Sequence, residues 1–277
     1  MTINTDKAIR LGRFWLPITR LMPAVAVALL AVSIVMGLSM QGGLLRLIPL
    51  TLAAALFALS VTAAVASAMK IRRADQDSYG DTDRAESTLA STVRWWRFSY
   101  DVCYRAMVTL MWLRHRQNRH AEARDVAGVI LRFRHRRLPE AIQSAAYCEA
   151  YASLKLGDLA GVPGALALIR CGPMTLELSL KIDAMEIQYL VQSGQGQVAL
   201  HDAERRTELT QLMPPDVAVK TLAWLALAAR QAGDEALSKK LVRQVELLAD
   251  VPKLVESQPR FAPLFLLDSV STASSSI

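Results

Sequence analysis

The hydrophobic residues of the N-terminal quarter fall in two long runs that contain no charged side chain. Residues 21–45 and residues 47–69 are both uncharged and mostly apolar. A helix needs about 20 such residues to cross the hydrocarbon core of a bilayer. The pattern therefore predicts a two-helix transmembrane hairpin within residues 21–69, with spans over about 23–40 and 49–69.

Basic residues around this hairpin lie almost entirely outside the two runs. Arg46 alone falls in the turn, whereas seven basic residues flank the hairpin: Lys7, Arg10, Arg13, Arg20, Lys70, Arg72 and Arg73. Because Lys and Arg accumulate on the cytoplasmic side of membrane proteins, we expect both termini to be cytoplasmic, with residues 1–20 as a basic N-terminus. The Ala-, Leu- and Arg-rich composition favours a bacterial inner membrane. A cleavable signal peptide has a core of only roughly 7 to 15 apolar residues, so the second full-length run favours an anchor.

Beyond the hairpin the chain first turns polar and then becomes periodic. Residues 70–88 are rich in acidic side chains and are expected to form a linker. From residue 89 onward, apolar residues recur in steps of three and four, which predicts one face of a long amphipathic helix. This face consists of Leu89, Val93, Trp96, Tyr100, Cys103, Met107 and Leu110.

Polar turns then recur at a nearly constant interval. They centre on Asn118, Gly157, Gly194 and Gly233, and their spacings are 39, 37 and 39 residues. A helical pattern lies on both sides of each turn, and no segment alternates as a strand would. We therefore predict an all-α fold, with about four helical hairpins in residues 89–250 and a C-terminal cap and disordered tail in residues 251–277.

The segments 150–158 (AYASLKLGD) and 225–234 (LALAARQAGD) each place a small residue seven positions before a Gly-Asp turn. In this feature the chain resembles tetratricopeptide-like (TPR-like) helical repeats, although that family has a period of 34 and aromatic residues where Ala, Val or Leu stand here. The resemblance implies an α-solenoid whose extended surface binds a protein segment. The expected function is a membrane-anchored adaptor or scaffold that binds a protein partner at the cytoplasmic face. The alternative is a structural or assembly subunit of a larger membrane complex, bound through the hairpin.

Charge is distributed unevenly along the chain. The net charge is +7, and residues 1–73 contribute eight basic residues and one acidic residue. A second concentration, residues 94–137, holds eleven arginines, three acids and several aromatic rings. This segment could contact anionic lipid, or its rings could instead fill the core of the first repeat; a nucleic-acid partner is not favoured. The candidate residues for binding a partner or the membrane surface are Arg94, Trp95, Arg97, Arg105, Arg116 and Arg119.

No constellation of residues predicts catalysis. The three cysteines, Cys103, Cys148 and Cys171, form no C-x-x-C pair, and the histidines do not have the spacing of a metal site. Glycine-rich phosphate or dinucleotide loops are absent from the sequence as well. We therefore predict neither an enzyme nor a cofactor.

Overall fold

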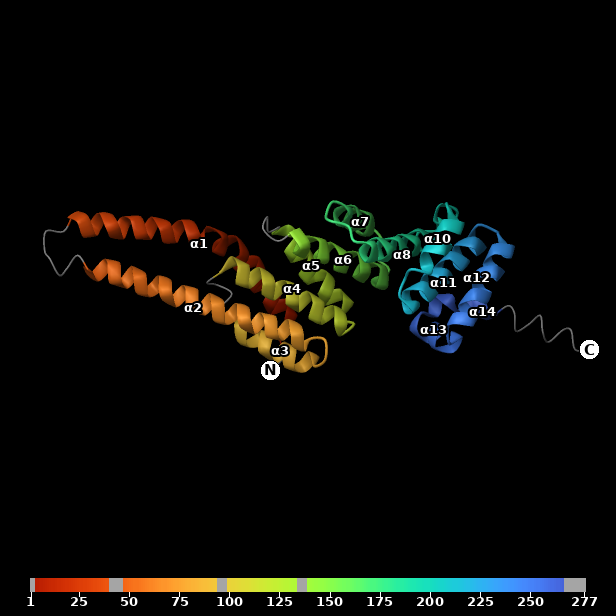
Figure 1. The fold of residues 1–277 in the computed structure, drawn as a ribbon, viewed down its shortest axis with the longest axis horizontal. Helices are drawn as coiled ribbons and strands as arrows, with labels where there is room; N and C mark the ends of the chain where they lie inside the picture. Colours follow the sequence, from red (N-terminus) through yellow and green to blue (C-terminus); the bar gives the residue numbers. More distant parts are fainter. Residues whose placement is uncertain (1–2, 40–46, 94–98, 134–138, 267–277) are drawn as a thin grey trace, which may run out of the picture. The chain divides into compact units, whose positions relative to one another are not determined.

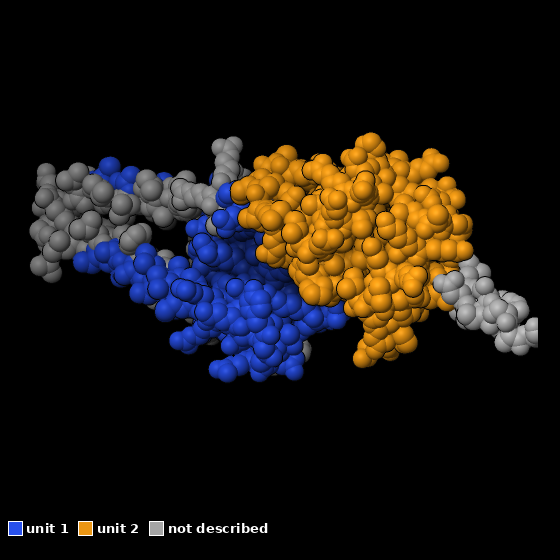
Figure 2. Space-filling view, turned by 45° about the vertical axis from the view of Figure 1, so that its right-hand side comes forward, with its two compact units in different colours: residues 1–152 blue, residues 153–277 orange. Residues whose placement is uncertain are grey.

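A computed structural model describes residues 3–39, 47–93, 99–133 and 139–266. All regular structure in these residues is helical and none of it is strand, which confirms the all-α prediction. The chain divides into two compact units, residues 1–152 and residues 153–277 (Figure 2). The boundary between the two units falls inside the helix of residues 139–156.

Unit 1 opens with two long antiparallel helices, α1 (Thr5–Ser39) and α2 (Leu47–Asp77) (Figure 1). Helix α1 begins about 18 residues earlier than the predicted span, because most of the segment expected as a basic N-terminus is helical. The apolar side chains of this segment recur at helical spacing and are buried against the rest of unit 1: Ile3, Ala8, Ile9 and Leu16. The N-terminal segment is therefore part of the folded unit.

The predicted spans, residues 23–40 and 49–69, fall on α1 and α2, although residue 40 and many of the side chains lie outside the described part of the chain. Among the residues that are described, no helix combines the length and the apolarity that crossing a membrane requires. The transmembrane hairpin therefore stays a prediction.

The segment expected as a linker, residues 70–88, is largely helical. Helix α2 continues to Asp77, and α3 spans Thr82–Thr92. Asp81 caps α3 by accepting a hydrogen bond from the backbone N–H of Arg84 at 2.9 Å, while Ala85 and Leu89 are buried. One acidic residue of the segment expected as a linker thus caps a helix, which is a common role of aspartate.

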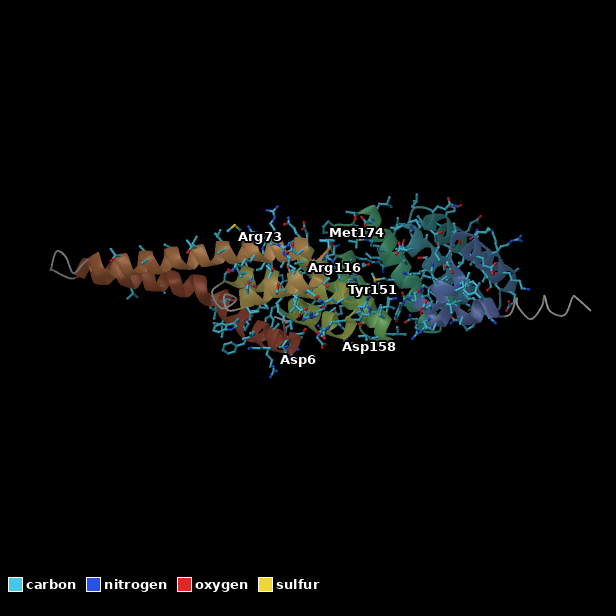
Figure 3. The ribbon with its side chains drawn as sticks, turned by 90° about the horizontal axis from the view of Figure 1, so that it is seen from below. Asp6, Arg73, Arg116, Tyr151, Asp158 and Met174 are labelled. Atoms are coloured by element: carbon cyan, nitrogen blue, oxygen red, sulfur yellow. The ribbon has the colours of Figure 1, made fainter. Side chains whose placement is uncertain are left out.

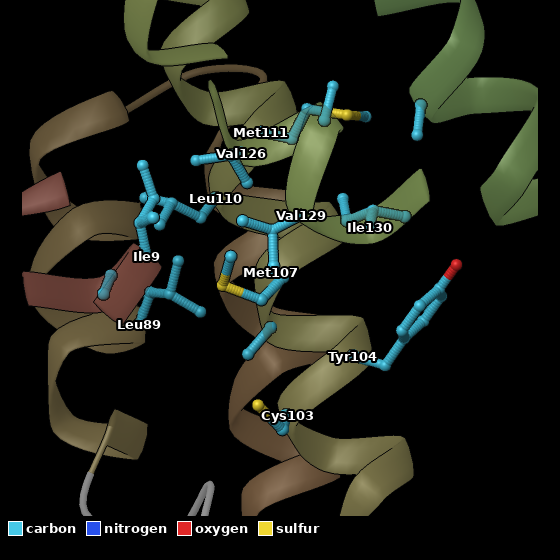
Figure 4. Packing of buried hydrophobic residues seen from close by; sticks show 14 of the residues in the cluster. Ile9, Leu89, Cys103, Tyr104, Met107, Leu110, Met111, Val126, Val129 and Ile130 are labelled. Carbon is cyan, nitrogen blue, oxygen red and sulfur yellow. The ribbon is translucent and has the colours of Figure 1, made fainter. Parts of the chain in front are cut away.

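The long amphipathic helix predicted from residue 89 is divided in two. Its first part is the end of α3, and its second part is α4 (Tyr100–Arg116), which Ser99 caps. Residues 94–98, between them, lie outside the described residues. Helix α4 is the centre of the unit 1 core (Figure 4), where fully buried side chains of α4 pack with Ile9, Leu89, Val126 and Ile130. These α4 side chains are Cys103, Tyr104, Met107, Leu110 and Met111.

The four predicted turns lie at the expected residues. Asn118, Gly157, Gly194 and Gly233 all have a positive φ, between 57° and 80°. In each turn the following residue donates its N–H to the carbonyl five positions earlier, at 2.8–3.0 Å. This is the Schellman geometry that ends a helix, and it explains why glycine or asparagine stands at each turn.

Each of these turns separates two helices, which we call a first and a second arm. The first arms are α4, α6 (Pro139–Leu156), α8 (Leu176–Gln192) and α11 (Pro215–Gln231). The second arms are α5 (His120–Arg132), α7 (Val162–Arg170), α9 (Gly196–Ala199) with α10 (Ala203–Thr210), and α12 (Glu235–Leu248).

The third hairpin differs from the prediction because its second arm is broken. Asp202, between α9 and α10, has a φ of 57°, which interrupts the helix. Helix α9 lies very close to α11, since a Cβ on Gly196 would stand 2.9 Å from the carbonyl oxygen of Ala228. The close approach of α9 to α11 therefore depends on a glycine at position 196.

Unit 2 ends in three short elements that cover part of its core. They are α13 (Val251–Ser257), the 3₁₀ turn η2 (Pro259–Phe261) and α14 (Ala262–Leu266). Phe261 is fully buried, with its ring centroid 4.9 Å from that of Trp224 on α11. Arg230 donates a hydrogen bond to the carbonyl of Pro263 at 2.6 Å. Residues 251–266 thus pack onto the last hairpin, and the tail from 267 lies outside the described residues.

Candidate functional site

The candidate arginines from the sequence do not form one surface patch. Arg94, Trp95 and Arg97 lie outside the described residues. Arg105 is exposed on α4 and lies three helical turns, roughly 16 Å, from Arg116 at the end of the same helix. In the described residues, the structure therefore places the candidates at opposite ends of α4.

Two of these arginines have partners within unit 1. The guanidinium of Arg116 lies over the ring of Tyr79 at 3.6 Å from the centroid and donates a hydrogen bond to Ser78 Oγ. Arg119 pairs with Glu122 one turn away on α5. Arg116 therefore joins the end of α4 to the turn after α2, and both arginines contribute to intramolecular contacts.

The aromatic residues of the described part of segment 94–137 mostly pack inside unit 1. Tyr104 is completely buried, and Tyr100, Trp112 and Phe133 pack against the same core. Tyr100 Oη donates a 2.6 Å hydrogen bond to the carbonyl of Phe133, which joins α4 to the end of α5. These contacts favour the alternative in which the rings fill the first repeat.

A buried arginine that the sequence analysis did not single out organises this end of unit 1. The side chain of Arg114 on α4 is 0% exposed. Its Nη2 lies 2.9 Å from Glu86 Oε1 and donates to the carbonyl of Ile3 at 2.7 Å, while its Nε donates to Thr5 Oγ1 at 2.8 Å. Arg114 thus connects the N-terminal segment, α3 and α4 through one guanidinium.

The remaining partners of Arg114 are Gln117 and Glu122, whose Oε2 lies 3.2 Å from Arg114 Nε. Arg114 Nη1 donates to Gln117 Oε1 at 2.6 Å, and Gln117 donates to the second oxygen of Glu86 at 3.3 Å. Burial alone raises the pKa of Glu86, but the hydrogen bonds from Arg114 and Gln117 and the charge of Arg114 outweigh it and lower the pKa. Since both ions have partners within unit 1, this cluster is a structural ion pair that joins three segments of the unit.

A signal for Arg114 is present in the sequence. The buried positions of α4 advance from Cys103 through Met107 to Leu110, and the next step of four reaches Arg114. A charged residue on an otherwise apolar face indicates a buried ion pair when a partner of opposite charge is nearby. The partner, Glu86, belongs to the segment expected as a linker, so the sequence pattern does not reveal the pair.

The most distinctive surface feature of unit 1 is a row of five neighbouring aromatic rings, which we call the aromatic row. It consists of Trp112 and His115 on α4, His120 on α5, and Tyr147 and Tyr151 on α6; Figure 3 labels Tyr151. Their ring centroids are 4.9–6.4 Å apart, from Trp112–Tyr147 at 6.3 Å to His115–Tyr151 at 4.9 Å. All five residues are half-buried, so the row is packed and still accessible.

The electrostatics of the aromatic row keep it largely uncharged. Burial, together with the nearby His120 and Arg116, lowers the pKa of His115 to about 4. His115 is therefore neutral near pH 7, and its Nδ1 is buried without a hydrogen-bond partner. Glu149, also on α6, has a pKa raised by burial, although the charge of Arg124 opposes this shift. The row thus presents ring surface that includes a neutral imidazole at His115.

The described residues around the aromatic row suit binding to another chain better than they suit catalysis. Burial raises the pKa of both Cys103 and Cys148 to about 12, so neither is an activated nucleophile. Within the described residues, no group of three or more His, Cys, Asp or Glu is placed to hold a metal ion. Flat, rigid and partly exposed rings instead suit the binding of another chain.

The aromatic row leaves a weak trace in the sequence. Tyr147 and Tyr151 are four residues apart in a helical segment, and Trp112 and His115 are three apart, so each pair shares a helix face. The two faces meet because α6 packs beside α4, and no local sequence pattern specifies that packing.

Comparison of the chain with protein-family models, with curated proteins and with solved structures finds no match.

Proposed function

We propose that this protein is a membrane-anchored helical-repeat adaptor. In this proposal the α1–α2 hairpin lies in the inner membrane of a bacterium, and TPR-like hairpins from α4 onward stack at its cytoplasmic face. A segment of a protein partner binds to the aromatic row. The observation that carries the proposal is the aromatic row on two consecutive first arms, α4 and α6.

The anchor is supported by the composition of the hairpin and by the exposure of its side chains. Residues 21–45 and 47–69 contain no charged residue. The described valines of this region are exposed, from 44% for Val61 to 65% for Val35. Apolar surface of this kind is costly in water, at about 25 cal/mol per Å², whereas a lipid environment removes that cost.

Binding of a protein segment is supported by the chemistry of the rings. Tyr and Trp supply large contact area with few rotatable bonds, and they are enriched where protein interfaces gain most of their energy. A partner segment with proline, leucine or arginine side chains would match ring faces of this kind. His115 adds ring surface without adding a charge near pH 7.

Site-specific photo-cross-linking in intact cells tests this proposal. A photoreactive residue is placed at Tyr147 in the full-length chain, and a control is placed at Leu247, which is 80% exposed on α12. We expect one dominant cross-linked protein from position 147 that is absent from position 247. The same cells are extracted with alkaline carbonate, and the chain should stay with the membranes. Release by carbonate, or equal cross-linking at both positions, would contradict the proposal.

The rival function, a structural subunit bound through the hairpin, has one observation in its favour. Small side chains of α2 are exposed along one face, at Thr51, Ala54, Ala55 and Ala58. Small residues let helices approach closely in lipid. Under this alternative, substitution of Ala54 and Ala58 by leucine would release the partner, whereas changes in the aromatic row would not.

A further inference from the structure

The exposed face of α1 changes its character along the helix. Exposed residues at helical spacing begin with Lys7, Arg10 and Arg13 and continue with Phe14, Ile18 and Leu21. The last three are 58%, 38% and 64% exposed. The opposite face of the same segment is buried in the unit 1 core, so only the outward face shows this change from cationic to apolar.

The exposed face of α2 shows the same change in the reverse chain direction. Val61, Val65 and Met69 are exposed at spacings of four, and Arg72 and Arg73 follow them, also exposed. Figure 3 shows Arg73 projecting outward from α2. Among the side chains that the structure describes, the apolar part therefore lies toward the hairpin turn on both helices, and the cationic part lies toward the folded bundle.

The two changes occur at the same level of the hairpin. Arg13 lies 26 residues before the end of α1 at Ser39, and Arg73 lies 26 residues after the start of α2 at Leu47. At 1.5 Å per residue, both are roughly 39 Å from the turn end of their helices. Since the helices are antiparallel neighbours (Figure 1), Arg13 and Arg73 form part of one band around the hairpin.

Along α1, basic residues are followed by aromatic and then by apolar residues, which is the order found from a membrane surface toward its interior. Phe14 lies next to Arg13, its ring packed edge-on against Trp15 at 4.9 Å, and tryptophan is typical of the lipid–water interface. Between Lys7 and Ala74 there is no acidic residue. A bilayer including its headgroups is about 40–45 Å thick, close to the length of hairpin beyond the band.

We propose that Lys7, Arg10, Arg13, Arg72 and Arg73 form a basic collar that binds the headgroups of anionic phospholipids. The inference rests on the proposed membrane hairpin and names the lipid that its base contacts. Charge complementarity selects an anionic headgroup over a zwitterionic one, since each basic residue near such a surface contributes about 1 kcal/mol. A nucleic acid or an acidic protein would match the cations but leaves the adjoining apolar residues Phe14, Ile18 and Met69 unexplained.

This collar differs from the lipid contact expected from segment 94–137. In that segment the described rings pack against the unit 1 core, whereas Phe14 and Ile18 are exposed beside the collar. The collar cations are also solvent-exposed, so replacing them removes charge without opening the core.

The test measures lipid selectivity of the full-length protein in vesicles of phosphatidylcholine with a minor fraction of phosphatidylglycerol. Electron paramagnetic resonance of spin-labelled lipids reports the motionally restricted fraction of each lipid at the protein surface. The collar variant carries Arg13→Gln, Arg72→Gln and Arg73→Gln. A matched control carries Lys239→Gln, Lys240→Gln and Arg243→Gln, three exposed positions on α12. Circular dichroism confirms that both variants remain helical.

We expect the wild-type chain and the α12 control to prefer phosphatidylglycerol by roughly threefold or more, and the collar variant to approach equal association. Raised salt should weaken the wild-type preference, because exposed charges are screened. If the wild-type chain resists carbonate extraction but associates equally with both lipids, the proposal of the collar is wrong and the proposal of the anchor is unaffected. An unchanged preference in the collar variant would overturn it as well. A chain that carbonate releases from the vesicles would overturn the anchor itself, and the collar with it.

Discussion

Arg114 and Glu86 form an ion pair of 2.9 Å whose side chains are only 0% and 6% exposed. The pair joins α4 to α3, and through the carbonyl of Ile3 and the hydroxyl of Thr5 it also joins the start of α1. The first helix of the predicted anchor is thus fixed to the bundle at its base. Segment 70–88, expected from the sequence to be a linker, takes part in this contact through Glu86 on α3.

Removing Glu86 from this pair should destabilise unit 1. Glu86→Gln removes the carboxylate nearest to Arg114 Nη2 and leaves only Glu122, 3.2 Å from Arg114 Nε, as a carboxylate partner, so the loss should be about 1–3 kcal/mol. The exposed pair of Arg84 with Asp77 provides the control, because Arg84 is 72% exposed and Arg84→Met should cost less than about 1 kcal/mol. Denaturant unfolding of the detergent-solubilised chain at neutral pH measures both. Equal, small losses would show that the buried pair is not stabilising.

Mild acid should destabilise the protein through His115. Its folded pKa of about 4 lies below the ordinary value of 6.5, so between these values the unfolded chain binds a proton that the folded chain does not. The contribution of His115 to stability should therefore be fully present well above pH 6.5 and be lost as the pH decreases toward 4, by on the order of 2 kcal/mol after allowance for partial exposure. The thermal midpoint measured over this range, for the wild type and for His115→Gln, isolates the effect. An identical pH dependence in the variant would disprove it.

Two Gly→Ala substitutions in unit 2 should change stability in opposite directions. At Gly196 a new Cβ meets the carbonyl of Ala228 at 2.9 Å, so the substitution should cost about 1–3 kcal/mol. At Gly164, in α7, a new Cβ meets nothing within 4 Å, and the greater helix preference of alanine should stabilise by a few tenths to about 1 kcal/mol. Paired denaturation curves decide between these outcomes. The same sign at both positions would contradict the close approach of α9 to α11.

The three cysteines should react at very different rates. Cys171 is exposed, whereas Cys103 and Cys148 are buried, and burial raises the pKa of each buried thiol to about 12. Brief treatment of the folded chain with a maleimide should therefore label Cys171 alone, and labelling in denaturant should reach all three. Peptide mass spectrometry identifies the sites. Rapid labelling of Cys103 in the folded chain would show that the unit 1 core opens readily.

The turns of the repeat region could be predicted because each depends on one residue. A backbone with positive φ favours glycine or asparagine, so Asn118, Gly157, Gly194 and Gly233 mark the ends of helices by themselves. The same reasoning misses Asp202, whose positive φ interrupts the second arm of the third pair, because aspartate adopts this conformation only occasionally and is a weaker signal than glycine.

What could not be predicted depends on contacts between distant residues. The basic, charged start of the chain reads as a solvated tail, yet Ile3 and Thr5 are buried because they meet Arg114, more than 100 positions later. Likewise, each half of the aromatic row is visible as a helical pair, but their meeting requires α6 to pack beside α4. Periodicity locates helix faces and does not state which faces come together.

The central claim is that the aromatic row, and not the membrane hairpin, holds the partner. Quantitative affinity capture from solubilised membranes tests this with the wild type, with Tyr147→Ala/Tyr151→Ala, and with a chain whose residues 21–66 are replaced by an unrelated apolar hairpin of equal length. The replacement leaves Leu16 and Ile71, both buried in the core, in place. We predict that the partner is lost from the tyrosine variant and retained by the replaced hairpin. Retention by the tyrosine variant together with loss on hairpin replacement would contradict the account and favour the membrane subunit.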